Sequence, residues 1–252
     1  MTTMQRLRQN LASLLAVTVL IAGSPMAVAA GDAALTPHTA EYKIKISVLG
    51  GRLITTLAET ELGYRAESSI RATGMSRIIA GGEIRESSEF SKSAEGLRPD
   101  HFVSNDGLTR DKETVDFAFD WDAGVITGLL NGENFETSVE GIVHDRVSLQ
   151  YGLMHDLVND VHRSDYFLQD AEKFKPLSIT NIGSKPVKVP FGNFEAIGVQ
   201  HQAAGSSRIT TLWCVEELDF LPVIIEQHRK GKLKVRAVLT AYTPATIDTT
   251  SR

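Results

Sequence analysis

The chain has 252 residues, of which 42% are hydrophobic and 23% are charged, and its formal net charge is −5. An acidic chain lacks the basic surface that binds phosphate backbones, which argues against a nucleic-acid partner. The single cysteine, Cys214, excludes an internal disulfide. It lies within an apolar segment, so we expect a small buried side chain rather than a reactive thiol.

The first 30 residues have the pattern of a secretory leader. Arg6 and Arg8 precede an apolar run from Leu11 to Gly23, which is too short to cross a bilayer, since that takes about 20 residues. A buried core helix is the alternative, which the flanking charges and small residues disfavour. An Ala-x-Ala motif predicts cleavage after Ala29 or Ala30. We therefore expect a periplasmic protein with no membrane-spanning segment after cleavage, and a formal net charge of −7 because both arginines are lost.

The rest of the chain predicts one domain and a short tail. No linker rich in proline, glycine or serine divides residues 31–243, whose length suits a single β-rich domain. Residues 244–252 have no apolar pattern, so we expect them to form a flexible tail.

Alternating apolar and polar residues predict strands from the start of this domain. Residues 42–48 alternate, Gly50-Gly51 predicts a hairpin turn, and residues 53–62 and 64–72 continue the pattern. Residues 75–82 interrupt it with an apolar helical turn that ends at glycine. We expect this turn to plug one end of a barrel or sandwich; a mobile lid over a cavity is the alternative.

Further strands are predicted at residues 83–93, 97–105, 112–121, 125–130 and 133–139. Asn131-Gly132, between the last two, is the strongest short-range hairpin signal in the chain.

One helix is predicted from Asp145 to Val161. Asp145 is a good N-cap, and apolar residues follow it at helical spacing. These residues are Val147, Leu149, Tyr151, Leu153, Met154, Leu157, Val158 and Val161. A helix this apolar must lie on the sheet or in its mouth.

After the helix the chain returns to strands. They are predicted at residues 166–169, 177–181 and 194–202, with three more between Arg208 and Tyr242. Residues 187–193 are expected to form a turn. About a dozen strands, spaced roughly 8–12 residues apart, are typical of a β-sandwich or barrel.

Five short segments carry a family resemblance. They are the opening hairpin from Ala40 to Gly51, the helix start from Asp145 to Tyr151, the turn from Pro190 to Ala196, and the closing segments Thr211 to Trp213 and Leu221 to Glu226. Together they resemble the domain of unknown function 3108 family of exported Gram-negative proteins, over nearly all of the chain after the leader. The resemblance implies a mainly β fold: one antiparallel curved sheet or an open β-barrel, with one α-helix packed on the concave side. This fold is similar in outline to the periplasmic lipoprotein carriers of the outer-membrane localisation pathway.

Nothing in the sequence predicts a catalytic or a metal site. The seven histidines are scattered, and no pair has the His-x-x-x-His spacing of a zinc site. No Gly-x-Ser-x-Gly elbow or phosphate-binding glycine loop is present. We expect a non-catalytic protein without cofactor or metal. A hydrolase is the weakest hypothesis, because it needs a serine, a histidine and an acid to meet in space.

The remaining signal is a surplus of apolar faces, which can fill a closed core or line a groove. The candidate lining residues are Phe117, Phe119, Trp121, Tyr151, Met154, Val158 and Trp213. They would bind a hydrophobic ligand, a lipid or an acylated partner such as a lipoprotein, in a half-open barrel. The alternative is an envelope structural or assembly factor that contacts another protein through a sheet edge or the convex face.

Overall fold

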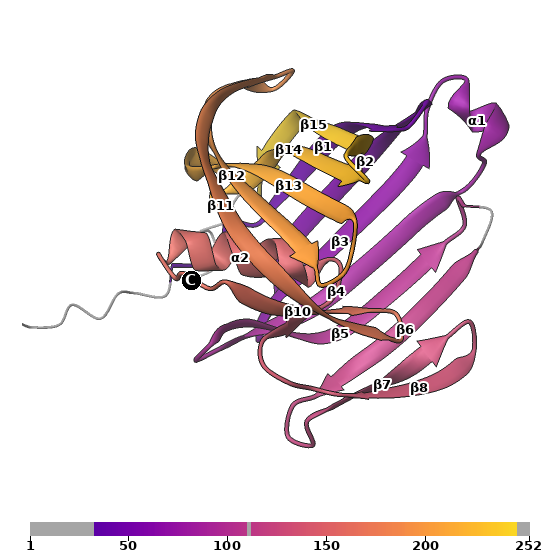
Figure 1. Cartoon of the computed structure of the whole chain (residues 1–252), viewed down its shortest axis with the longest axis vertical. Coiled ribbons are helices and arrows are strands. Elements are labelled where there is room, and N and C mark those ends of the chain that lie inside the picture. Colours follow the sequence, from indigo (N-terminus) through magenta and orange to yellow (C-terminus); the bar gives the residue numbers. More distant parts are fainter. Residues whose placement is uncertain (1–32, 110–111, 246–252) are drawn as a thin grey trace, which may run out of the picture. The chain divides into compact units, whose positions relative to one another are not determined.

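The computed structural model of the chain describes residues 33–109 and 112–245 (Figure 1). These residues form one sheet of 15 strands in the order β8-β7-β6-β5-β4-β3-β2-β1-β15-β14-β13-β12-β11-β10-β9. The strands are β1 (His38–Ile46), β2 (Leu49–Glu59), β3 (Gly63–Ala72), β4 (Glu83–Ser93), β5 (Gly96–Asp106), β6 (Glu113–Asp120), β7 (Val125–Leu130), β8 (Glu133–Ser138), β9 (Val143–His144), β10 (Asp165–Asp170), β11 (Lys173–Val189), β12 (Gly192–Ala203), β13 (Arg208–Val215), β14 (Leu221–Arg229) and β15 (Lys232–Pro244). The helical elements of this part are α1 (Ser76–Ile79), α2 (Ser148–Val158) and the short 3₁₀ helix η1 (Glu216–Leu218).

Most strands pair antiparallel with the next strand along the chain. This order runs from β1 to β8 and from β10 to β15, and β1 also pairs with β15, so the first and last strands lie side by side within the sheet. Within the described residues, β9 and β10 are the parallel pair, because α2 connects them as a crossover. The sheet ends at β8 and β9 and is not closed. The predicted mainly β fold with an open sheet is therefore confirmed.

The strand that the sequence analysis missed is β9. Its two residues, Val143 and His144, are too few to carry an alternating pattern. The turn expected at residues 187–193 is also shorter than predicted, because β11 continues to Val189 and β12 begins at Gly192. Val187 and Val189 are both buried on one face of the sheet, which extends the strand through a segment that looks like a turn in sequence.

Burial alternates along the strands and defines an inner face. In β1, Ala40, Tyr42 and Ile44 are buried, whereas Lys43 and Lys45 are exposed on the outer face. Inner residues from both halves of the sheet meet in one large apolar cluster. The curved sheet therefore encloses its own core, with charged side chains on the outside.

Helix α2 lies within this core and is buried on two sides (Figure 1). Tyr151 and Met154 pack into the large cluster, whereas Leu149 and Leu153 pack against residues of β10–β13 in a second cluster. At Gly152 an added Cβ would lie 2.5 Å from a ring carbon of His144, so the helix approaches β9 more closely than a side chain permits. The predicted helix on the concave side is confirmed, and its apolar surface is wider than one stripe because both sides are covered.

Helix α2 begins at Ser148, three residues after Asp145, and ends at Val158, so it is shorter than the predicted helix over residues 145–161. The Asp145 carboxylate accepts hydrogen bonds from the backbone N–H groups of Val147 at 2.7 Å and Ser148 at 2.8 Å. It also accepts one from the Ser88 hydroxyl in β4 at 2.6 Å. Asp145 therefore ties the turn that leads into α2 to strand β4.

The expectation that residues 75–82 form a plug is wrong. The helix α1 is present there, but Met75, Ile78 and Ile79 are 76–77% exposed. Its buried residue is Ser76, whose hydroxyl accepts the N–H of Gly50 at 2.9 Å. A polar contact thus attaches α1 to the β1–β2 turn and leaves its apolar side chains in solvent.

The leader expected over residues 1–30 lies outside the described residues, as do residues 246–252 of the expected tail. The first residue of that tail, Pro244, instead belongs to β15, where it pairs with His38. At the boundary of the tail, the N–H of Ala245 donates to the carbonyl of Pro37 at 2.7 Å.

Candidate functional site

The predicted lining residues lie in the interior, where they pack against one another. Phe117, Phe119, Tyr151 and Met154 are at most 7% exposed, and Trp121 is half-buried against the same cluster. The Phe119 and Trp121 rings stack with centroids 5.4 Å apart. The indole N–H of Trp121 also donates to the carbonyl of Pro99 at 2.8 Å. These contacts fill space; neither of the hollows described below is lined by these residues.

Two other predicted lining residues, Val158 and Trp213, belong to or pack against the same large cluster. Val158 is the last residue of α2 and is half-buried. Trp213 follows Leu212, which packs in the second cluster, so Trp213 points to the opposite face of β13. There the Lys185 ammonium lies 3.6 Å from the centroid of the Trp213 ring. Ligand binding by the predicted residues stays a prediction, and Trp213 lies away from the side of β13 that α2 covers.

A partly buried charged network holds the start of α2. Arg146 contacts the carboxylates of Glu86 in β4 at 3.0 Å and Asp170 in β10 at 3.2 Å. It also donates to the Ser104 hydroxyl in β5 at 2.9 Å. Burial raises the pKa of Glu86, and the Arg146 charge opposes this rise. One guanidinium therefore links strands from the two halves of the sheet.

The end of α2 is held in the same way. The Arg163 Nε lies 2.8 Å from the buried Asp156 carboxylate, and the Tyr166 hydroxyl of β10 donates to the same carboxylate. Burial is the largest cause that raises the pKa of Tyr166, and this hydrogen bond is the second largest. Both ends of the helix are thus fixed by buried polar groups, whose partners must separate if the helix moves.

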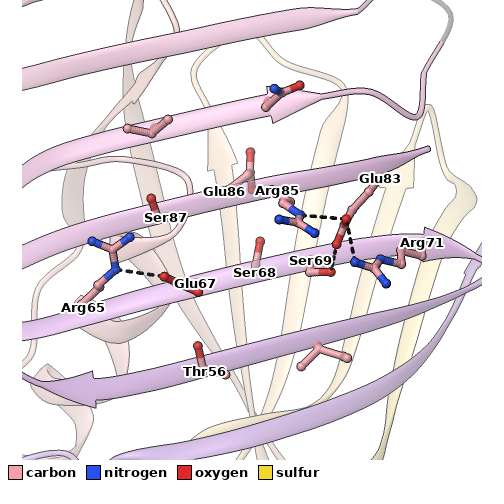
Figure 2. Close-up of a pocket in the computed structure, with 13 residues that line it drawn as sticks. Thr56, Arg65, Glu67, Ser68, Ser69, Arg71, Glu83, Arg85, Glu86 and Ser87 are labelled. Atoms are coloured by element: carbon pink, nitrogen blue, oxygen red, sulfur yellow. Dashed lines mark hydrogen bonds and ion pairs between the residues drawn. The ribbon is translucent and has the colours of Figure 1, made fainter.

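The outer face of β2–β5 carries a concavity of about 430 Å³, which we call the outer hollow (Figure 2). Its charged lining includes Arg65, Glu67, Arg71, Glu83 and Arg85. These side chains come from neighbouring strands, β3 and β4, which pair in antiparallel register. Because successive residues of a strand alternate between faces, the odd-numbered residues of both strands reach the same surface.

Glu83 is the centre of this array. Its carboxylate accepts hydrogen bonds from Arg71 Nη2 at 2.8 Å, Arg85 Nε at 2.7 Å and the Ser69 hydroxyl (Figure 2). The bond from Arg71 is the largest cause that lowers the pKa of Glu83 to about 2. Glu83 is therefore ionised at any physiological pH and holds the two arginines in place.

A second ion-pair group lies beside it. Arg65 donates to Glu67 at 2.9 Å and to Glu89 at 2.5 Å. Each arginine in the hollow keeps N–H groups beyond those bound to these carboxylates, since a guanidinium has five donors. No histidine or cysteine lines the outer hollow, and its hydroxyl groups belong to serine and threonine side chains. The arrangement suits recognition of a polar surface.

The sequence analysis did not single out these residues. The available signal was that opposite charges recur at alternate positions of one predicted strand, at Arg65, Glu67 and Arg71, and so lie on one face of it. Strand register, which pairs Arg65 with Glu89 and Arg71 with Glu83, was needed to bring the partners together.

A second concavity, of about 580 Å³, lies at the free edge formed by β7 and β8. Its lining includes Leu129, Asn134 and Glu136. Among the described residues, no group of three His, Cys, Asp or Glu side chains could hold a metal ion. No helix in the described ranges has the length and hydropathy needed to cross a bilayer. Cys214 is buried, and burial raises the pKa of its thiol to about 12, as expected for an inert core residue.

Comparisons with known proteins support the fold. A family sequence model described as "Protein of unknown function (DUF3108)" matches residues 39–237. The comparison with curated proteins gave no significant match. Among solved structures, a β-barrel-like protein of the domain of unknown function DUF1849 from Brucella abortus is similar, with a TM-score of 0.57 and 12% identity over 84% of this chain and 99% of that chain. A protein from Bacteroides fragilis, described as exported and YmcC-like in fold, aligns with a TM-score of 0.33 and 11% identity over 83% of this chain and 97% of that chain. At such identities the first likeness concerns the fold alone.

Proposed function

Because the chain belongs to the DUF3108 family of proteins of unknown function, we propose its function from its own surfaces: a non-catalytic periplasmic protein that binds another envelope protein through the outer hollow. Periplasmic export is supported by the leader pattern of residues 1–30. Non-catalytic binding is supported by a lining of arginines, carboxylates and serines without a histidine or cysteine.

The array of opposite charges around Glu83 carries this proposal. Arg65, Arg71 and Arg85 are each paired with a carboxylate of the same face, so the surface has little net charge. A free anion would gain little from such a surface. A protein surface with its own alternating charges would gain more, because it can meet donors and acceptors together. Electrostatic complementarity of this kind favours specific pairing.

The interior supports the same choice. A carrier needs an internal space, yet Phe117, Tyr151 and Met154 are each 1% exposed and contact other core residues. Opening such a space by moving α2 would break the contacts of Asp145 at one end and Asp156 at the other. An outer site needs no such change.

Site-specific photo-cross-linking in intact cells tests the proposal. A photoreactive residue at Ser87, which lines the outer hollow, should give one discrete protein adduct. The same residue at Lys188, exposed on β11, should give none. Arg85→Glu should weaken the Ser87 adduct, since it reverses the charge beside Glu83. The absence of any adduct at Ser87, or an equal adduct at Lys188, would count against partner binding through this face.

A hydrophobic ligand is the second candidate. It is supported by the half-buried Trp121 and Val158, which border the interior of a sheet that does not close. Mass spectrometry of lipids extracted from the gently purified protein tests it. A stoichiometric lipid that is lost in Trp121→Ala would support a carrier. A lipid-free protein would remove this candidate.

A further inference from the structure

Four large apolar side chains are unusually exposed at one end of the sheet. Val48 is 88% exposed, and Met75, Ile78 and Ile79 are 76–77% exposed. Among the described residues, Leu62 is the one other large hydrophobic side chain above 70% exposure, and it lies in the β2–β3 turn at the opposite end. We call the first four residues the apolar tip. Clusters of this kind mark interaction surfaces, whereas single exposed apolar residues are ordinary.

The four residues belong to two loops that hold each other in place. The Ser76 hydroxyl accepts the N–H of Gly50 at 2.9 Å, and the N–H of Thr73 donates to the carbonyl of Gly50 at 3.0 Å. These bonds set α1 beside the β1–β2 turn that carries Val48. Figure 1 shows α1 at the end of β2 and β3, clear of the rest of the sheet. The tip is thus a fixed projection whose apolar residues have no core to enter.

Basic residues lie beside the tip, although the chain as a whole is acidic. Residues 42–58, 68–82 and 227–245 contain ten lysines and arginines and no aspartate or glutamate. These segments form neighbouring strands, β1–β3 with β14 and β15, and the N–H of Ser47 donates to the carbonyl of Lys234 at 2.8 Å. The β14–β15 turn, rich in lysine, therefore lies beside the β1–β2 turn.

Acidic groups that flank these segments pair with three of the ten basic residues: Glu41 with Arg52, Glu83 with Arg71 and Glu226 with Arg236. Glu83, at the start of β4, accepts from Arg71 and Arg85. Asp106, at the end of β5, accepts the backbone N–H groups of Leu108 and Thr109. The side chains of Lys45, Lys230, Lys232 and Lys234 are exposed, and they lie on β1, β15 and the β14–β15 turn, on the side of the tip where β15 adjoins the β1–β2 turn.

We propose that the apolar tip docks on an anionic phospholipid bilayer, with Met75, Ile78 and Ile79 entering the interface and the lysines of β1 and the β14–β15 turn contacting lipid phosphates. A bilayer surface combines an apolar layer with a negatively charged one, and both features of this end match it. A protein partner would have to supply the same two features in one place. Docking through the tip does not involve the outer hollow, so the membrane proposal and the protein-partner proposal can be tested independently.

Vesicle flotation with protein expressed from the full-length chain is the test. The protein should float with vesicles of phosphatidylcholine and phosphatidylglycerol, and much less with phosphatidylcholine alone. Binding should weaken as salt is raised, because the lipid contacts are exposed charges. Ile78→Ser with Ile79→Ser should lower partitioning on the order of tenfold. Lys45→Gln with Lys234→Gln should lower binding to the anionic vesicles and not to the neutral ones.

The chain offers a matched control. Leu62→Ser removes an apolar side chain of the same exposure, 79%, from the opposite end and should leave flotation unchanged. Ile79→Trp should give a fluorescence emission that shifts to shorter wavelength on adding anionic vesicles, whereas Leu62→Trp should give no such shift. Equal loss with Leu62→Ser, or no flotation of the unaltered protein, would overturn the proposal. If Ile78→Ser with Ile79→Ser lost a cross-link to another protein but still floated with the vesicles, the proposal would also be overturned, and the tip would be assigned to a protein partner.

Discussion

At the residue scale, His144 shows how burial sets a charge state. Its side chain is 1% exposed, and burial is the main cause that lowers its pKa to about 4. The folded protein therefore keeps His144 neutral, whereas the unfolded chain binds a proton near pH 6.5. The contribution of His144 to the free energy of unfolding is therefore fully present above about pH 6.5, and it is lost as the pH falls toward about 4.

The expected effect can be measured by urea unfolding. Between about pH 7.5 and pH 5 the contribution of His144 to the unfolding free energy should fall by about 2 kcal/mol. His144→Gln should remove this part of the pH dependence. His162→Gln, at an exposed histidine, is the control and should leave it unchanged. An identical pH dependence in the protein and in His144→Gln would contradict the assignment.

Gly152 is the residue that allows the close contact between α2 and β9. Gly152→Ala would place Cβ 2.5 Å from the His144 ring, and we expect a loss of about 1–3 kcal/mol from overpacking. Gly81→Ala is the matched control, since no atom lies within 4 Å of its added Cβ. Thermal unfolding compares them. A Gly152→Ala protein as stable as the control would show that the helix can move away from the strand at little cost.

At the element scale, Arg146 decides how α2 and the two halves of the sheet are joined. Arg146→Ala leaves the Glu86 carboxylate, in an environment that already raises its pKa, without its charge partner. We expect a loss of about 2–3 kcal/mol in the free energy of unfolding, because a buried charge without a partner is costly.

Arg52→Ala is the comparison for that variant. Arg52 pairs with Glu41 on the outer face and is 53% exposed, so its loss should cost less than about 1 kcal/mol. Chemical unfolding of both variants measures the difference. Equal losses would mean that the network around Arg146 is no stronger than a surface ion pair.

At the scale of the whole molecule, the pairing of β1 with β15 joins the two halves of the chain. Because β15 lies between β1 and β14, a chain that ends after Arg229 lacks a strand from inside the sheet. We expect such a chain to lose its cooperative unfolding transition, whereas one that ends after Ala245 should keep it. Circular dichroism during heating distinguishes them. A cooperative transition in the shorter chain would show that the two halves fold independently.

Much of the fold could be predicted from local sequence. Residues 83–93 were assigned as a strand with the bounds that β4 has, because alternation is strong and glycines precede it. The β9 strand could not be found, because its two residues are too few to show an alternating apolar and polar pattern. The position of α1 was misjudged because an apolar helical turn normally finds a core, and its attachment through the polar Ser76 is a long-range contact.

The sequence by itself determined the fold class, the inert cysteine and the apolar residues of the interior, because periodicity and residue type act over a few neighbouring positions. Only the tertiary structure decided which surfaces are available for function. The Glu83 array depends on the register between β3 and β4, and the apolar tip with its basic surroundings depends on β1 pairing with β15. These contacts join residues far apart in the chain, and no local pattern encodes them.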